Sequence, residues 1–263
     1  MLTPTYLPDL APDCTDRSIE KIRREGFCRF GALAAKPNIV LWGDSHAYAI
    51  LPAVEEAIAG KGRAGIFVGN SGCPPIFGIG RRDGKLCAAT NEEMQQVLLD
   101  ADIKTVVLHA RWAAYTGDGL QGKGLATDAW PDGAPGGDWQ IIKEKMERGI
   151  GSLVQRGKHV VLIGPVPELD WDVPKAMAEA MLFGRHFDRR LAVAAFRERQ
   201  KRMDSVFEKF RDSAGVTLVQ PSTKLCDDVD CRVEWEAKPL YRDSNHLSMT
   251  GAFYVSSIFS GVL

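Results

Sequence analysis

The stretch that most constrains the fold is an apolar run that ends at a sharp polar turn, NIVLWGDSHAY (38–48). Residues 38–42 predict a buried strand, and the Ala-, Ile-, Leu- and Val-rich residues 47–59 predict a helix. Ser45 then lies on a strand-to-helix turn, where its hydroxyl is exposed above the sheet and the helix dipole favours negative charge. A plain capping role for Asp44 or Ser45 is the alternative, and for an isolated Gly-Asp-Ser it is the more frequent one.

A second polar motif, DSNHLS (243–248), lies near the other end of the chain. An Asp three residues before a His can place its carboxylate against one ring nitrogen and leave the other nitrogen to deprotonate a serine. Asp243 and His246 therefore form a candidate Ser-His-Asp triad with Ser45. The backbone amide of Ser45 would point to the place where a tetrahedral oxyanion forms.

Three motifs together resemble the SGNH (GDSL-type) hydrolase superfamily: GDSH (43–46), SGCPP (71–75) and YRDSNHLS (241–248). More narrowly, they resemble the SGNH domain that is fused to membrane-embedded acyltransferase-3 proteins, which O-acetylate bacterial surface polysaccharides. The resemblance runs from about residue 28 to the C-terminus.

The resemblance implies further site residues. In SGNH enzymes the loop after the second strand supplies a glycine amide to the oxyanion hole, and Gly72 matches that position; a simple glycine turn is the alternative. The G-x-N-D block of the general superfamily, whose Asn gives a third oxyanion donor, is missing. The fused branch has an A-R-W ending there, as residues 110–112 do, so Arg111 or Trp112 is expected to contact substrate. His109 is expected to be structural.

Five predicted strands separated by helices indicate an α/β fold, a three-layer doubly wound parallel sheet in flavodoxin-like order 2-1-3-4-5. In that order ligands bind at the carboxyl ends near the first strand, where Ser45, Gly72 and the Arg111–Trp112 corner would converge. The strands are expected at residues 38–42, 63–70, 104–110, 158–165 and 216–220, and the further helices at 91–101, 138–156, 189–213 and from Ser248 onward.

The chain is expected to divide into an N-terminal extension, residues 1–36, and an SGNH catalytic domain, residues 37–263. The extension combines a Pro-rich lead with a short charged helix. The Gly-rich segment 116–137 is expected to be either a glycan-contacting flap with Trp130 as stacking platform or a floppy insertion.

A Met- and Ala-rich helical piece, KAMAEAMLFG, follows the fourth predicted strand. Its Met177, Met181 and Leu182 could form an exposed apolar face that docks on a partner domain. Packing of these side chains on the core is the expected arrangement.

The six cysteines fall into close pairs, and local pairing needs no long loop closure. Each of the first two bridges would contribute about 3 kcal/mol in the chain-entropy model. Such bridges indicate an oxidising compartment, whereas six reduced thiols would indicate the cytosol. A zinc site is disfavoured because no pair has C-x-x-C spacing. The expected bridges are Cys14–Cys28, Cys73–Cys87 and Cys226–Cys231.

Length and composition limit the fold and the classes of function that this chain can have. A chain of 263 residues with 45% hydrophobic residues can bury one sizeable α/β core. A net charge of −1 gives no electrostatic reason to expect nucleic acid as a partner. No stretch approaches the roughly 18 apolar residues of a membrane span. A monomer is expected.

The N-terminus has neither a basic region nor an apolar region of a signal peptide, which conflicts with an oxidising compartment. The chain is therefore expected to be a fragment. The resemblance implies an attached N-terminal acyltransferase-3 membrane domain that is absent from this chain, and a location at the periplasmic face of the bacterial inner membrane.

The expected reaction is transfer of an acetyl group, through acetyl-Ser45, to a hydroxyl of a cell-envelope glycan such as O-antigen or exopolysaccharide. No cofactor or metal is expected, since the membrane domain or a partner would deliver the acetyl donor. A carbohydrate O-acetylesterase would use the same residues with water as acceptor. A non-catalytic glycan-binding module is a further alternative. A metallophosphoesterase would need a GNH-[DE] block and further Asp or His ligands, which the sequence lacks.

Overall fold

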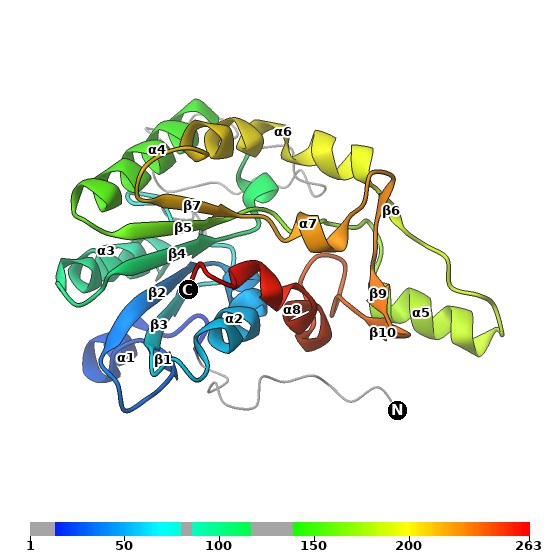
Figure 1. Cartoon of the computed structure of the whole chain (residues 1–263), viewed down its shortest axis with the longest axis horizontal. Helices are drawn as coiled ribbons and strands as arrows, with labels where there is room; N and C mark the ends of the chain where they lie inside the picture. Colours follow the sequence, from blue (N-terminus) through cyan, green and yellow to red (C-terminus); the bar gives the residue numbers. More distant parts are fainter. Residues whose placement is uncertain (1–13, 80–85, 117–138) are drawn as a thin grey trace.

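Parallel strands form the centre of the sheet in the computed structural model, which describes residues 14–79, 86–116 and 139–263 (Figure 1). The strands are β2 (Pro37–Gly43), β3 (Ala64–Gly69), β4 (Thr105–His109), β5 (His159–Ile163) and β7 (Val216–Val219). Their order, β3-β2-β4-β5-β7, is the predicted 2-1-3-4-5 arrangement. The α/β fold class is therefore confirmed, and the carboxyl ends of these strands share one edge of the sheet.

The described sheet contains one strand that was not predicted. β1 (Cys28–Gly31) pairs antiparallel with β3 at the edge of the sheet. Only Phe30 of this strand is buried, and so short a segment shows too little alternation to separate a strand from a loop. Thr15 makes a further bridge to Gly69. Residues 14–31 therefore contribute to the sheet, and the division of the chain at residue 36 stays a prediction.

Helices cover both faces of the sheet, because side chains alternate along each strand. Leu41 of β2 packs under one helical layer, whereas Val40 and Trp42 pack under the other. The first layer consists of α2 (Ser45–Ile58), α8 (Met249–Val255) and η2 (Ser256–Phe259). The second consists of α3 (Leu86–Leu99), α4 (Trp139–Gln155) and α6 (Val193–Phe210). Figure 1 shows α2 and α8 side by side in the first layer. In the second layer α4 lies beside α6, and Glu147 of α4 forms an ion pair with Lys209 of α6.

The predicted apolar face of the long helix 189–213 packs on the sheet. Its buried side chains in the second layer are Met203, Val206, Phe207 and Phe210. The remaining elements are short: α1 (Ile19–Glu25), η1 (Trp112–Tyr115), α5 (Val173–Leu182), β6 (Leu191–Ala192), α7 (Ser222–Leu225), β8 (Asp230–Cys231), β9 (Glu234–Trp235) and β10 (Lys238–Pro239).

α5 corrects one expectation about packing. Met177 is partly buried against the core, but Met181 and Leu182 are 75% and 79% exposed. These two side chains lie in the last turn of α5, where the helix projects away from the sheet (Figure 1). The prediction that they pack on the core is therefore wrong.

All three predicted disulfides are present: Cys14–Cys28, Cys73–Cys87 and Cys226–Cys231. Disulfides of this density are typical of proteins that fold in an oxidising compartment. None of the helices in the described ranges is long and apolar enough to cross a bilayer.

Two predictions concern segments outside the described residues. One is the Pro-rich lead, of which residues 1–13 are not described. The other is the Gly-rich segment with Trp130, of which only Thr116 is described.

The close approach of β2 to β4 gives a first prediction. A Cβ atom on Gly43 would lie 1.7 Å from the backbone oxygen of His109, so that Gly43→Ala must force the two strands apart. We expect it to lower the free energy of unfolding by about 3 kcal/mol, measured by urea unfolding. The control is Gly151→Ala in α4, where a Cβ atom meets nothing within 4 Å and a gain of about 0.5–1 kcal/mol is expected. An unchanged unfolding midpoint for Gly43→Ala would contradict the packing described.

Candidate active site

Ser45 is the first residue of α2, and only Asp44 separates it from the end of β2. The helix begins here because Asp44 caps it: the backbone N–H of His46 donates to Asp44 Oδ1 at 2.8 Å. The predicted strand-to-helix turn is confirmed. It places the hydroxyl of Ser45 at the carboxyl edge of the sheet.

A chain of hydrogen bonds links Ser45 to the loop after β10. His246 Nε2 lies 2.7 Å from Ser45 Oγ, and His246 Nδ1 lies 2.7 Å from Asp243 Oδ2. When Nδ1–H donates to Asp243, Nε2 accepts the hydrogen bond from the serine hydroxyl. The other oxygen of Asp243 accepts the backbone N–H groups of Asn245 and His246, each at 2.8 Å. The three side chains that were predicted to meet are therefore in hydrogen-bond contact.

Asp243 carries the negative charge of this arrangement. Burial favours the neutral carboxyl group, but the hydrogen bond and charge of His246, together with the two backbone N–H groups, outweigh burial. The pKa of Asp243 therefore lies well below its usual range, and the group is ionised at neutral pH. An ionised Asp243 can stabilise the imidazolium that forms when Nε2 of His246 takes a proton.

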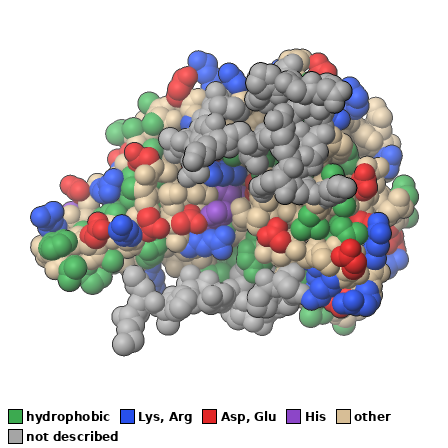
Figure 2. All heavy atoms as spheres, turned by 180° about the vertical axis from the view of Figure 1, so that it is seen from behind, with side chains coloured by type: hydrophobic (Ala, Val, Ile, Leu, Met, Phe, Trp, Pro, Cys, Tyr) green, Lys and Arg blue, Asp and Glu red, His purple; other side chains and the backbone are tan. Residues whose placement is uncertain are grey.

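The site is open to solvent. The side chains of Asp243 and His246 are 36% and 18% exposed. Figure 2 shows histidine side chains at the surface of the face turned away from the viewer in Figure 1, with Lys or Arg side chains beside them. A substrate can therefore reach the imidazole.

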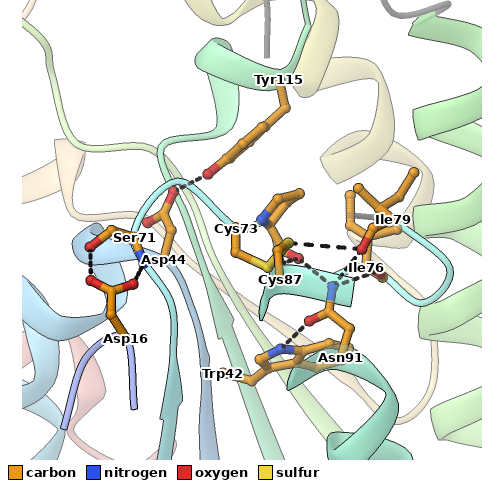
Figure 3. Close-up of a disulfide and its surroundings, with 11 residues drawn as sticks. Asp16, Trp42, Asp44, Ser71, Cys73, Ile76, Ile79, Cys87, Asn91 and Tyr115 are labelled. Carbon is orange, nitrogen blue, oxygen red and sulfur yellow. Dashed lines mark hydrogen bonds between the residues drawn. A yellow bond between two sulfur atoms is a disulfide. The ribbon is translucent and has the colours of Figure 1, made fainter. Parts of the chain in front are cut away.

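Asp44 ties the turn before α2 to the segment after β4. Its Oδ2 accepts the backbone N–H of Arg111 at 2.9 Å. The same oxygen accepts the hydroxyl of Tyr115 at 2.5 Å (Figure 3). The residue is 1% exposed, and burial raises its pKa although these donors act in the opposite direction. The sequence analysis considered Asp44 only as a cap, because no local pattern shows that Tyr115 reaches back to it.

The loop after β3, which carries Gly72, is held from two sides. Gly72 has a φ of +65°, and the N–H of Cys73 donates to the backbone oxygen of Asn70 at 3.0 Å, which closes a tight turn. On one side Cys73 is bridged to Cys87 in α3. On the other, Asp16 accepts the backbone N–H and the hydroxyl of Ser71, each at 2.6 Å (Figure 3). An oxyanion role for the Gly72 amide stays a prediction.

Asn91 of α3 holds the chain that follows this loop, a role that the sequence analysis missed. Its Nδ2 lies 3.3, 3.1 and 3.0 Å from the backbone oxygens of Pro74, Ile76 and Ile79. Its Oδ1 accepts the indole N–H of Trp42 at 3.1 Å (Figure 3). A buried side chain therefore takes the place of regular secondary structure in fixing residues 74–79.

Arg111 shares a buried carboxylate with Arg199. Arg111 Nε and Arg199 Nη2 each donate to Glu168 Oε2 at 2.6 Å. Burial opposes ionisation of Glu168, but the hydrogen bond from Arg199 and the charge of Arg111 outweigh burial, so the pKa of Glu168 is lowered. The side chain of Arg111 is 24% exposed. A substrate contact from Arg111 stays a prediction.

Trp112 lies elsewhere than predicted. The residue is 1% exposed, and its indole N–H donates to the backbone oxygen of Ile163 at 2.8 Å. The ring packs edge-on against Phe207 of α6, with ring centroids 6.0 Å apart. The η1 turn directs the indole into the core. The prediction that Trp112 contacts substrate is therefore wrong. His109 is fully buried, as expected of a structural residue.

The shared carboxylate gives a second prediction. We expect Glu168→Gln to lower the free energy of unfolding at pH 7 by about 3 kcal/mol, because two arginines lose a buried charged partner. The pKa of Glu168 is lowered in the folded state. Its ionised form therefore stabilises the fold above the unfolded pKa of about 4.3, and this contribution is lost as the pH falls through the folded pKa.

The difference in stability between wild type and Glu168→Gln should therefore shrink below about pH 4. Urea unfolding at a series of pH values measures this difference. Glu198→Gln is the control, since Glu198 is exposed and, among the described residues, forms its ion pair with Lys201 at 3.6 Å. A change below about 0.5 kcal/mol is expected there. If the difference in the free energy of unfolding between wild type and Glu168→Gln does not vary with pH, the pairing of Glu168 with the two arginines is contradicted.

A family model described as "SGNH domain (fused to AT3 domains)" matches residues 13–261. The solved lipopolysaccharide acetyltransferase periplasmic domain of Salmonella ser. Paratyphi A resembles the chain with a TM-score of 0.68 and 16% sequence identity, over 94% of this chain and 90% of that chain. At this identity the likeness concerns the fold alone.

Weaker similarities reach a "putative platelet activating factor" from Streptococcus pneumonia and a "putative acylhydrolase" from Bacteroides fragilis NCTC 9343. The first has a TM-score of 0.46 and 13% identity, over 86% of this chain and 83% of that chain. The second has a TM-score of 0.45 and 12% identity, over 86% of this chain and 88% of that chain. No curated protein matches the sequence.

The family model covers nearly all of the described residues, including Ser45, Asp243 and His246. The chain therefore belongs to the family of SGNH domains that are fused to AT3 domains.

Proposed function

We propose that this domain is a serine O-acetyltransferase that moves an acetyl group to a hydroxyl of a bacterial cell-envelope glycan. Family membership supports an acetyltransferase- or esterase-type role. The observation that carries the proposal is the pair of 2.7 Å contacts that connect Ser45, His246 and Asp243. This geometry suits a serine that is activated by a neighbouring base.

In the first step His246 Nε2 takes the proton of Ser45 Oγ while that oxygen attacks the acetyl carbonyl of the donor. Asp243 stabilises the imidazolium that results. Collapse of the tetrahedral intermediate breaks the bond to the donor's leaving group, which takes the proton from His246. Acetyl-Ser45 is the product.

The negative charge on the tetrahedral oxygen needs donors. As the first residue of α2, Ser45 has a backbone N–H without an intrahelical partner, at the positive end of the helix dipole. The amide of Gly72 is the proposed second donor. The two attachments of its loop, the Cys73–Cys87 disulfide and the Asp16–Ser71 hydrogen bonds, favour a preorganised position.

In the second step a glycan hydroxyl attacks the carbonyl of acetyl-Ser45 and gives its proton to His246. The bond to Ser45 Oγ breaks, and Oγ recovers the proton. Arg111 is the proposed contact for the glycan, because it lies two residues after the end of β4 and is partly exposed.

The acetyl donor, in this proposal, reaches Ser45 from an attached membrane acyltransferase-3 domain, and the domain works at the periplasmic face of the inner membrane. The family description, with its fusion to AT3 domains, supports this arrangement. The fold likeness to a periplasmic domain and the three disulfides agree with it.

A carbohydrate O-acetylesterase is the second candidate, since water can replace the glycan in the second step with the same residues. A metallophosphoesterase is disfavoured by the hydrogen bonding of the GDSH turn. Both oxygens of Asp44 accept internal hydrogen bonds, and His46 Nε2 is bonded to Asn245. A non-catalytic glycan-binding module would retain its sugar affinity after loss of Ser45.

The nucleophile gives a third prediction. A serine-directed fluorophosphonate should label Ser45 and no other serine, as mapped by digestion and mass spectrometry. Ser45→Ala should lower hydrolysis of activated acetyl esters by about 10³-fold or more, whereas Ser152→Ala in α4 should not change it. Labelling elsewhere, or full turnover by Ser45→Ala, would exclude the mechanism.

The acceptor gives a fourth prediction. With an activated acetyl ester and an added envelope-glycan fragment, acetate and acetylated sugar should both form. The ratio of acetylated sugar to acetate should rise as the fragment concentration increases. Arg111→Ala should reduce transfer more than hydrolysis. Arg199→Ala is the matched control, because it removes the other donor to Glu168 and should affect both products in the same proportion. Rapid deacetylation of acetylated glycans without any transfer would replace the transferase by the esterase.

A further inference from the structure

A second hydrogen bond joins the two segments that carry the proposed catalytic residues. Ser45 contacts His246, and the next residue, His46, contacts Asn245: His46 Nε2 lies 2.9 Å from Asn245 Oδ1. Both bonds therefore connect the first turn of α2 to the loop after β10. His46 is 2% exposed and Asn245 is 9% exposed, so this second bond is shielded from water.

The hydrogen bonding of Asn245 determines which nitrogen of His46 carries the proton. Asn245 Nδ2 donates to Ser244 Oγ at 3.0 Å, so its Oδ1 faces His46. An amide oxygen only accepts hydrogen bonds, and His46 Nε2 must therefore be the donor. His46 is the Nε2–H tautomer when it is neutral.

The ring of His46 also packs on the proposed base. The ring centroids of His46 and His246 lie 4.6 Å apart, with an angle of 49° between the ring planes. His46 thus contacts the His246 loop twice, through Asn245 and through the imidazole itself.

The surroundings of His46 keep its ring uncharged. Burial, and next the charge of His246, lower the pKa of His46 to about 3. Glu168 and Asn245 act in the opposite direction, and Arg111 adds to the lowering.

The ring of His109 lies 6.2 Å from that of His46, and burial lowers the pKa of His109 to about 3 as well. The pair is therefore neutral at the pH at which His246 must accept a proton.

We propose that His46 is a positioning residue, which holds His246 in line with Ser45 by donating to Asn245 and by packing a neutral ring against the imidazole. A neutral neighbour matters because His246 becomes positive in both steps of the proposed reaction. A second positive ring at this distance would oppose that charge. His46 acts through His246 and Asn245 and takes no proton from the substrate.

The kinetic test rests on the proposed function and uses hydrolysis of p-nitrophenyl acetate. His46→Ala and Asn245→Ala should each lower kcat by about 10- to 100-fold and leave KM within about twofold, because the base is misplaced while the ester site is unchanged. The double variant should be no worse than His46→Ala, since that substitution alone already removes the contact with Asn245.

His46→Gln retains a side-chain N–H donor but not the ring, so it should recover part of the rate that His46→Ala loses. His159→Ala is the matched control, because His159 Nε2 also bonds a side chain, Thr217 Oγ1 at 2.8 Å. His159 is the first residue of β5 and lies at the sheet edge opposite to Ser45. It should keep the wild-type kcat. A wild-type kcat for His46→Ala, or no recovery with His46→Gln, would overturn the proposal.

The spectroscopic test does not depend on activity. Nitrogen-15 NMR of the wild-type chain should show His46 as the Nε2–H tautomer, without titration between about pH 5 and 8. Asn245→Asp places a carboxylate opposite Nε2, so His46 should then titrate in this range, and the pH–rate profile should gain a second ionisation.

An Nδ1–H tautomer or a titrating His46 in the wild type would overturn the proposal whatever the enzyme does. If fluorophosphonate does not label Ser45 in the wild type, the proposed function fails, while the NMR result still decides the role of the His46–Asn245 bond.

Discussion

The buried carboxylate of Asp44 is the interaction on which the active-site edge depends. One of its oxygens caps α2 by accepting the backbone N–H of His46. The other accepts the backbone N–H of Arg111 and the hydroxyl of Tyr115. A desolvated carboxylate is costly unless such donors surround it. The turn that presents Ser45 can therefore form only when β2 and β4 lie side by side. The position of Ser45 thus depends on the pairing of β2 with β4.

Most of the fold could be predicted, because the central strands are buried on both faces and form continuous apolar runs such as NIVLW and TVVLH. β1 could not be predicted, since its pairing with β3 decides its conformation and only Phe30 is buried. The apolar face of α5 was recognised, but its direction was not. Met181 and Leu182 are exposed because the helix projects beyond the sheet, and a helical period contains no such information.

Some residues of the candidate site could likewise be predicted from the sequence, and others could not. Asp243 and His246 could be paired from the sequence because their contact is local, with both residues in one short loop. Trp112 was misplaced because a strand-end motif does not show whether the next side chain points outward or, as here, into the core. The roles of Tyr115, Asn91 and Glu168 depend on partners that are remote in sequence. Such contacts become visible only when the sheet has brought their elements together.

Ser45 and His246 are 201 residues apart, and this separation has a consequence for biosynthesis. A growing chain exposes Ser45 long before the segment with His246 leaves the ribosome. Without its base the serine hydroxyl is a weak nucleophile. In the proposed mechanism Ser45 therefore becomes reactive only after β7 has joined the sheet and the loop beyond β10 has packed against α2. An unfinished chain could then not be acylated at Ser45 before the domain has folded.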